Sequence, residues 1–271
     1  MKKLLSLVLI MGIGFGANAQ DKKFQVGLVL GPTFNWTKIQ TEKIERNGIG
    51  NGFTIGIGGN YMFNNNIGLA SGIQFDLESF KLNYGSDINS ALGDVFYAYD
   101  DTDIQKYDED DQRVKDFTDT TAFMLSTRKF RAKYVTIPIF LKFQTNLIGK
   151  FKYYGKFGIR TSILAGIRMD DTGYNADYDP DLGTFDQISV SARTQENMKP
   201  VTLKKGLSQV RMGIGIYGGT EWNFTGTTFL YAELGFNYGI TPALYQKSNH
   251  LVEKTEPSTG TYEYTSLDIK N

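Results

Sequence analysis

The residues of this chain that come closest to a metal site are three aspartates at alternate positions. Asp177, Asp179 and Asp181 have the spacing of the first ligands of a calcium-binding loop. The pattern then fails, because glycine comes one place late, at Gly183, and Ile188 stands where the loop needs a bidentate glutamate. The three aspartates are therefore weak candidates for a cation site, and the sequence predicts no cofactor.

Catalysis by proton transfer has a single histidine available, His250, in the last predicted loop. Hydrolases generally place such a histidine beside a serine or an aspartate, and a lone histidine in a loop is more often incidental. The sequence therefore favours a protein that is not an enzyme, with a cell-surface hydrolase kept as an alternative. The chain contains no cysteine, which excludes a disulfide framework and a thiolate metal site.

Two glycine-rich stretches, Gly56–Gly59 and Gly213–Gly215, superficially look like phosphate-binding loops. Such a loop must follow a strand and open a helix. Here the alternation of apolar and polar residues continues through the glycines, which predicts strand positions instead. Lysine plus arginine and aspartate plus glutamate balance at 29 each, so nucleic acid is not an expected partner.

The segment from Asp100 to Asp119 is strongly acidic. Because like charges repel one another, we favour a solvated, mobile surface loop. Binding of divalent cations or of a partner at the cell surface is the alternative interpretation. The acidic residues are Asp100, Asp101, Asp103, Asp108, Glu109, Asp110, Asp111, Asp116 and Asp119.

Strict alternation of apolar and polar residues is the main structural signal. From Leu230 to Ile240, for example, every second residue is apolar, and the residues between include Glu233 and Gly235. Each such segment is long enough to span a membrane as a tilted strand, which needs about 9–11 residues. The alternation predicts seven strands, at residues 24–36, 53–63, 67–82, 131–144, 151–168, 210–224 and 230–240.

The polar faces of these strands are rich in glycine and tyrosine, with sparse charges. That composition suits a narrow barrel lumen, in which small residues leave room and opposite charges pair, because isolated charges there would cost several kcal/mol. We expect Glu221 and Glu233 to lie near Arg211, Arg160 or Lys156. The full predicted luminal charge network is Asp76, Glu78, Lys142, Lys152, Lys156, Arg160, Arg168, Arg211, Glu221 and Glu233.

The connections between the predicted strands alternate in length. Short turns lie at residues 64–66, 146–150 and 225–226, and long connections lie at 37–50, 85–127, 170–206 and 243–261. Outer-membrane barrels have short periplasmic turns and long outer loops in this order. With a periplasmic N-terminus, every long connection is therefore expected outside the cell.

The N-terminus has the features of a secretory signal peptide. Lys2 and Lys3 precede an apolar run, and Ala17-Asn18-Ala19 supplies small residues for cleavage before Gln20. We therefore predict a signal peptide at residues 1–19 and one barrel domain at 20–271, exported to the outer membrane. No later apolar stretch has the length of a spanning helix, which excludes a helical membrane protein.

The stretch from Tyr134 to Phe143 resembles the central strand of PorT-like outer-membrane β-barrels of the Bacteroidetes. Members typically show a tyrosine, an acidic residue, Ile-Pro, an aliphatic run, and a lysine before an aromatic residue; Thr136 here replaces the acid. Proline also cannot donate to a sheet ladder, so Pro138 marks a bulge or a local break. Further stretches similar to the family are Phe24–Leu28, Gly213–Gly219 and Phe229–Tyr238.

The resemblance implies an eight-stranded barrel and, from the family's name-giving member, a role tied to protein secretion. The predicted fold is thus an all-β, antiparallel up-and-down transmembrane barrel of about eight strands with long outer loops. The predicted function is a non-enzymatic structural, interaction or secretion-accessory role. The expected partners are outer-membrane lipid and, as candidates, envelope or secretion proteins. A narrow conduit for a small solute is an alternative, although eight strands leave room only for side chains.

The C-terminus departs from the pattern of a closed barrel. After the last loop, Tyr262 to Ile269 alternates only weakly. Either this segment is a short eighth strand that pairs with Phe24–Trp36, or the barrel is incomplete. In family members a stretch resembling Leu267–Asn271 leads into the last strand, so we favour an incomplete barrel.

Overall fold

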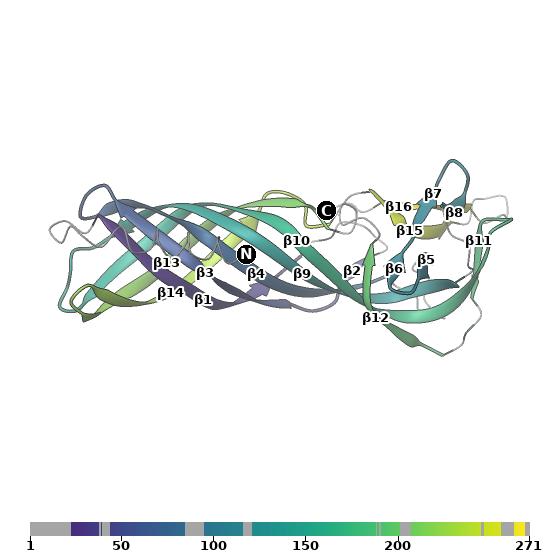
Figure 1. The fold of residues 1–271 in the computed structure, drawn as a ribbon, viewed down its shortest axis with the longest axis horizontal. Helices are drawn as coiled ribbons and strands as arrows, with labels where there is room; N and C mark the ends of the chain where they lie inside the picture. Colours follow the sequence, from purple (N-terminus) through teal and green to yellow (C-terminus); the bar gives the residue numbers. More distant parts are fainter. Residues whose placement is uncertain are drawn as a thin grey trace, which may run out of the picture.

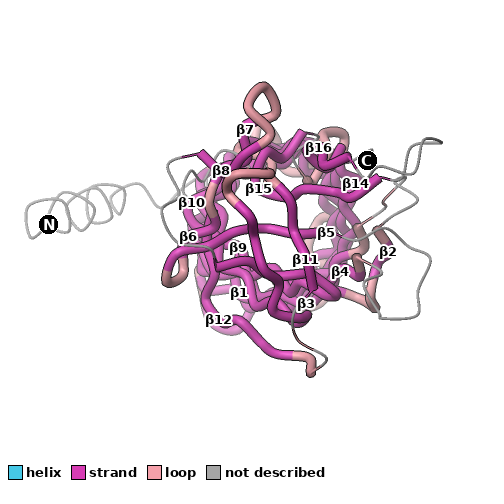
Figure 2. Tube along the Cα trace, turned by 90° about the vertical axis from the view of Figure 1, so that its right-hand side faces the viewer, coloured by secondary structure: helices cyan, strands magenta, loops and turns pink. Residues whose placement is uncertain are grey.

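The computed structural model describes most of the chain, and the described part is mainly β-structure. It covers residues 23–37, 39, 44–84, 95–115, 121–187, 189, 191–200, 207–244, 247–255 and 263–268. Figure 2 shows strands and loops throughout this part of the chain. None of the described residues forms a helix long and apolar enough to span a membrane. The predicted signal peptide lies outside the described residues.

Long antiparallel strands form the wall of a barrel at one end of the molecule (Figure 1). They pair in the order β1-β3-β4-β9-β10-β13-β14 and overlap the segments predicted from alternation. Both β9 and β10 extend well beyond the predicted bounds. The strands are β1 Phe24–Asn35, β3 Gly50–Met62, β4 Ile67–Asn83, β9 Thr121–Gln144, β10 Phe151–Asp179, β13 Val210–Thr225 and β14 Thr228–Gly239.

The exterior of this wall is apolar because alternate side chains point outward. Leu234 is 86% exposed, whereas the side chain of its neighbour Glu233 is only 16% exposed. A surface of this kind is unfavourable in water and suits lipid. We call it the lipid-facing belt: Leu28, Leu30, Ile55, Ile57, Ile73, Phe75, Leu77, Ile137, Ile139, Leu141, Phe157, Ile159, Ile163, Ile214, Ile216, Leu234 and Phe236.

Pro138 produces a local break in the ladder between β4 and β9. Ser71 pairs with Ile139 and Gln74 pairs with Thr136, so the register continues unchanged across the break. The Ser71 hydroxyl donates to the Pro138 carbonyl oxygen at 2.8 Å. The strand thus passes its proline without a bulge, which is one of the two outcomes that the sequence predicts.

A second β-structure, which we call the distal β domain, is built on the ends of β9 and β10 beyond the barrel (Figure 1). It fills connections that the sequence predicts only as long loops. Its strands are β5 Val95–Asp100, β6 Asp103–Ile104, β7 Lys106–Asp108, β8 Arg113–Lys115, β11 Thr184–Gln187, β12 Arg193–Pro200, β15 Lys247–Thr255 and β16 Glu263–Asp268. A short strand, β2 Glu45–Arg46, pairs with the end of β4.

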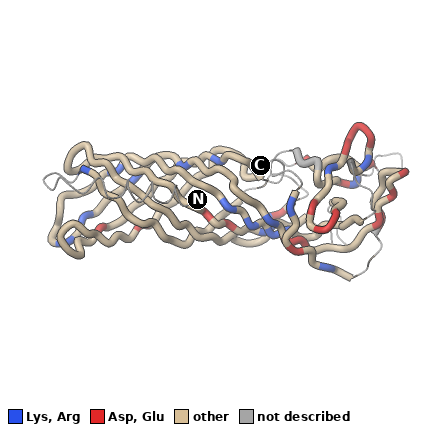
Figure 3. Tube along the Cα trace, in the orientation of Figure 1, with Lys and Arg blue, Asp and Glu red and all other residues tan. Residues whose placement is uncertain are grey.

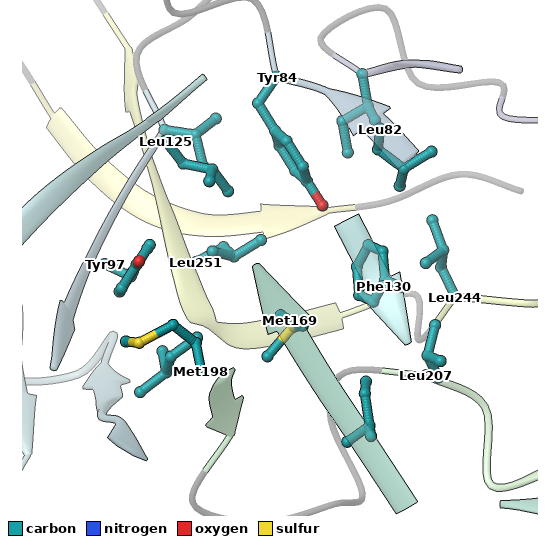
Figure 4. Packing of buried hydrophobic residues seen from close by; sticks show 14 of the residues in the cluster. Leu82, Tyr84, Tyr97, Leu125, Phe130, Met169, Met198, Leu207, Leu244 and Leu251 are labelled. Atoms are coloured by element: carbon teal, nitrogen blue, oxygen red, sulfur yellow. The ribbon is translucent and has the colours of Figure 1, made fainter. Parts of the chain in front are cut away.

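The distal β domain has its own hydrophobic core. Figure 4 shows side chains from several distant segments packed together, among them Tyr84, Met169 and Leu251. Arg128 and Asp171 are buried beside these residues, with side chains 4% and 0% exposed, and are joined by two hydrogen bonds of 2.7 and 2.6 Å. The Arg128 guanidinium also lies over the ring of Tyr97, 5.3 Å from its centre.

The acidic segment is more ordered than the mobile loop that we favour from its sequence. Residues up to 115 form β6, β7 and β8, while Asp116 and Asp119 lie outside the described residues. Tyr107 and Val114 are buried, and the Val114 amide donates to the Tyr178 hydroxyl at 2.7 Å. These buried side chains offset the repulsion between the aspartates, which stay on the surface around them.

The described sheet leaves the barrel open between β1 and β14. Strand β16 pairs with β15 in the distal β domain, so the alternative of a short closing strand on Phe24–Trp36 is wrong. The open seam agrees with the incomplete barrel that we favour from the sequence. β1 pairs only with β3, and β14 only with β13, among the described strands. The Tyr231 hydroxyl reaches across this seam and donates to the Leu28 carbonyl oxygen at 2.9 Å.

Candidate functional site in the barrel lumen

The lumen contains a series of charged side chains held by their opposite partners. Asp76 on β4 has the largest set of partners. One carboxylate oxygen accepts a hydrogen bond from Thr54 at 2.5 Å, and the other accepts from Thr136 at 2.5 Å and from Arg160 at 2.7 Å. Thr136 also contacts the Ser162 hydroxyl at 2.7 Å. Thr136 on β9 therefore binds a carboxylate supplied by the neighbouring strand β4.

Two lysines lie among aromatic rings, closer to the short turns of the barrel than Asp76 and its partners are. Lys142 is buried and pairs with Glu221, and its ammonium lies 4.7 Å from the centre of the Tyr154 ring. Lys156 pairs with Glu233 at 2.6 Å. Its ammonium lies 5.3–5.7 Å from the ring centres of Phe140, Tyr154 and Tyr217. Each cation therefore has a carboxylate and at least one ring face as counter-groups.

A further pair lies toward the distal β domain. Arg211 on β13 donates to both carboxylate oxygens of Glu78 on β4 at 2.8 Å. Its guanidinium also lies over the Tyr134 ring, 3.9 Å from the centre. Two strands that are not neighbours in the sheet are thereby connected through the lumen.

Glycines on the luminal face make room for the aromatic rings. The Tyr217 ring occupies the space that a Cβ on Gly235 would need. At Gly219 the same holds for the Tyr154 ring, whose atoms would lie 2.7 Å from an added Cβ. Rings and ion pairs therefore project into the lumen and lie close to the backbones of the wall. The geometry therefore suits a plugged barrel in which charges neutralise one another, as expected for so few strands.

Most of the predicted luminal charges meet in these pairs, and two behave differently. Lys152 lies over the Phe229 ring at 5.3 Å, and no ion pair is found for it among the described residues. Arg168 is exposed on the exterior, which differs from its predicted luminal placement. A β-bulge between Leu164 and Gly166 shifts the register of β10 against β9, so the alternation changes face before Arg168.

Two of the three weak metal candidates, Asp177 and Asp179, accept hydrogen bonds from nearby backbone amides. The Asp179 carboxylate accepts hydrogen bonds from the backbone amides of Asp181 and Leu182 at 2.8 and 3.1 Å. The Asp177 carboxylate accepts from the Tyr178 amide. Within the described ranges no group of three or more His, Asp or Glu side chains is placed to hold a metal ion. His250 is 3% exposed on β15, so it is buried in a strand and not in the predicted open loop.

Sequence reasoning missed the partners of the charges. Alternation alone does not say which charged group each uncharged luminal side chain contacts. These uncharged side chains, all on the polar faces of the strands, are Thr54, Ser162, Phe140, Tyr154 and Tyr217. The abundance of tyrosine on those faces was the available signal. Cross-strand register, which the sequence does not encode locally, decides the contacts.

A family comparison agrees with this architecture. The family model described as outer membrane protein beta-barrel domain matches residues 18–245. The chain belongs to this family. Membership supports an outer-membrane location for the barrel, and the lipid-facing belt is consistent with it. The match ends before β15, so the last two strands of the distal β domain lie outside it. No curated protein and no solved structure matched the chain.

Proposed function

We propose that this barrel is a plugged, non-enzymatic membrane anchor that presents the distal β domain outside the cell as a docking surface for a basic envelope or secretion protein. The observation that carries the proposal is the contrast between the two ends of the molecule. The lumen contains charges that are paired with one another and packed on rings, whereas the distal β domain is a separate β-structure with a charged surface.

The acidic surface is formed by two packed hairpins. The β7–β8 and β10–β11 hairpins meet where the Val114 amide on β8 donates to the Tyr178 hydroxyl on β10. Figure 3 shows acidic segments concentrated at this far end of the molecule. We call it the acidic tip, and its carboxylates are Glu109, Asp110, Asp111, Asp177, Asp179, Asp181 and Asp186. Complementary charge speeds association and selects the partner, which favours a partner with a basic surface.

The orientation is tested by labelling cysteines in a chain that has none of its own. Asp110→Cys should react with a membrane-impermeant maleimide on intact cells. Asn65→Cys, in the short turn at the other end, should react only after the outer membrane is opened. The reverse result would place the acidic tip in the periplasm and overturn the proposal.

The docking role is tested by cross-linking the purified full chain to envelope proteins solubilised in detergent. A variant with Asp110→Asn, Asp111→Asn and Asp181→Asn should lose a cross-linked partner that the native chain captures. A control with Glu45→Gln, Glu263→Gln and Asp268→Asn removes the same charge from other exposed positions and should keep it. Equal capture by both variants would contradict a role for the acidic tip.

A narrow conduit is the second candidate, because charged groups line the lumen from one end to the other. Planar-bilayer recording separates it from the plugged barrel. We expect no steady open channels, since Lys142 and Lys156 are both held by carboxylates and rings. Reproducible channels from the folded chain would favour the conduit.

A further inference from the structure

Basic side chains gather on the exterior of the wall where the barrel meets the distal β domain. They are Lys81 on β4, Lys129, Arg131 and Lys133 on β9, and Arg168 on β10, and all five residues are exposed. We call them the basic patch. Figure 3 shows Lys and Arg segments concentrated at this junction. Because the whole chain has no net charge, the patch is a pronounced local asymmetry.

The register of the sheet places cations directly opposite one another. Lys81 pairs with Lys129, and Arg131 pairs with Arg168. Like charges in directly opposed positions destabilise a sheet. Arg131 is relieved by Asp170, at 2.6 Å, but Lys81, Lys129 and Lys133 form no ion pair with any residue that the structure describes. The patch therefore gains stability from any anion that binds between the strands.

A shallow surface pocket of about 450 Å³ opens beside two of these lysines. Lys81 and Lys129 line it together with Asp170, which is already bound to Arg131. Ammonium, hydroxyl and amide groups are donors with which proteins bind phosphate. The other polar side chains that line the pocket are of this kind: Asn47, Asn51, Ser79, Thr127 and Thr172.

The patch is continuous with the lipid-facing belt. Lys133 pairs directly with Leu77, which is 45% exposed and belongs to the belt. Further along the same strands and faces lie Phe75 and Ile137. A molecule with phosphate groups at one end and acyl chains at the other would therefore contact the basic patch and the lipid-facing belt at the same time.

We propose that the basic patch binds the phosphate groups of a phosphorylated glycolipid of the outer leaflet, with its acyl chains against the lipid-facing belt. The proposal rests on the orientation given under the proposed function, which places the patch at the outer leaflet. The lipid phosphates neutralise the opposed lysines and fix the depth at which the barrel sits in the membrane.

The test titrates bis-phosphorylated lipid A onto the folded full chain in detergent micelles and measures bound lipid by native mass spectrometry. Lys81→Gln with Lys129→Gln should weaken binding about tenfold or more, because each lysine near the headgroups contributes. The matched control is Lys23→Gln with Lys150→Gln, two exposed lysines at the other end of the barrel. It should bind about as tightly as the native chain, since those charges lie far from the headgroups.

Further arms identify the ligand. Dephosphorylated lipid A should bind no more tightly to the native chain than to the patch variant, and inorganic phosphate should not displace lipid A. Binding to the native chain should also weaken as salt rises, a result that needs no variant to fold.

The proposal is overturned by equal binding in the patch variant, by an equal loss in the control, by salt-independent binding, or by displacement with inorganic phosphate. Cysteine labelling tests the orientation separately, so the two failures are distinguishable.

Discussion

At the scale of single residues, the barrel depends on which way each side chain points. Leu234 is 86% exposed on the belt, and the neighbouring Gly235 faces the ring of Tyr217 in the lumen. Adjacent residues therefore meet lipid and a packed interior. A substitution at one position fails for a different physical reason from a substitution at the next.

Leu234→Arg should make folding into lipid less favourable by about 2–4 kcal/mol, because a charge near the middle of the bilayer is desolvated. Folding titrations in lipid vesicles measure this cost, with Leu234→Ala as an uncharged control. Gly235→Ala should also destabilise, but through the clash with Tyr217, and the additional substitution Tyr217→Ala should relieve it. A neutral Leu234→Arg variant would show that the face assignment is wrong.

The buried pair of Lys142 and Glu221 gives the second residue-scale prediction. Removing one member leaves a buried charge without its counter-charge and should cost about 3–5 kcal/mol. Removing both, as Lys142→Met with Glu221→Leu, should cost clearly less than either single change. Denaturant unfolding of the two single variants and the double variant measures the coupling. Additive losses would mean that the two groups do not interact.

At the scale of elements, the described strands of the barrel are not joined by a backbone hydrogen-bond ladder at the seam between β1 and β14. The two strands are parallel, because six antiparallel pairings separate them in the order β1-β3-β4-β9-β10-β13-β14. Both run from the short turns toward the distal β domain. Unpaired backbone groups cost several kcal/mol each in lipid. The described chain should therefore insert poorly unless another strand covers the seam.

Tyr231 partly bridges the seam, because its hydroxyl binds the Leu28 carbonyl oxygen. Tyr231→Phe should lower the free energy of unfolding by about 1 kcal/mol, the usual net value of one hydrogen bond. Tyr238→Phe is the matched control on the same strand, because that ring is 68% exposed on the exterior. Urea unfolding in detergent compares the two. Equal stability of both variants and the native chain would argue against a role for this bond.

At the scale of the whole molecule, two structures with different interiors share β9 and β10. The barrel is polar inside and apolar outside, whereas the distal β domain has an apolar core around the Arg128–Asp171 pair. Burial raises the pKa of Tyr84 to about 12, with Asp171 adding to the shift and Arg128 opposing it. Burial and Asp171 also raise the pKa of Tyr97 well above its ordinary value.

These tyrosines predict that alkali loosens the distal β domain before the barrel. Their raised pKa values favour the folded state fully below about pH 10, where an unfolded tyrosine is still neutral. That contribution is lost as the pH rises from about 10 toward 12. Tyrosinate absorbance should report this transition, and Tyr84→Phe should make it shallower. Fluorescence of the two tryptophans, Trp36 and Trp222, reports the barrel and should change later. Simultaneous changes would mean that the two structures unfold together.

By itself, the sequence determined the strands of the wall, their lipid-facing sides and most of the luminal charges. These features follow from the period of two along a strand, which is a local property of the chain. Leu234, Glu221 and Glu233 all lie on the side that alternation assigns to them. The acidic residues of the tip were also visible, although not the hairpins that hold them.

Only the tertiary structure decided which groups meet. The bulge after Leu164 moved Arg168 to the exterior, and the register then set it opposite Arg131 and created the basic patch. Contacts between distant segments built the distal β domain, and the pairing of β16 with β15 left the seam open. Each of these outcomes depends on pairing between residues far apart in the chain, which a pattern within one strand does not specify.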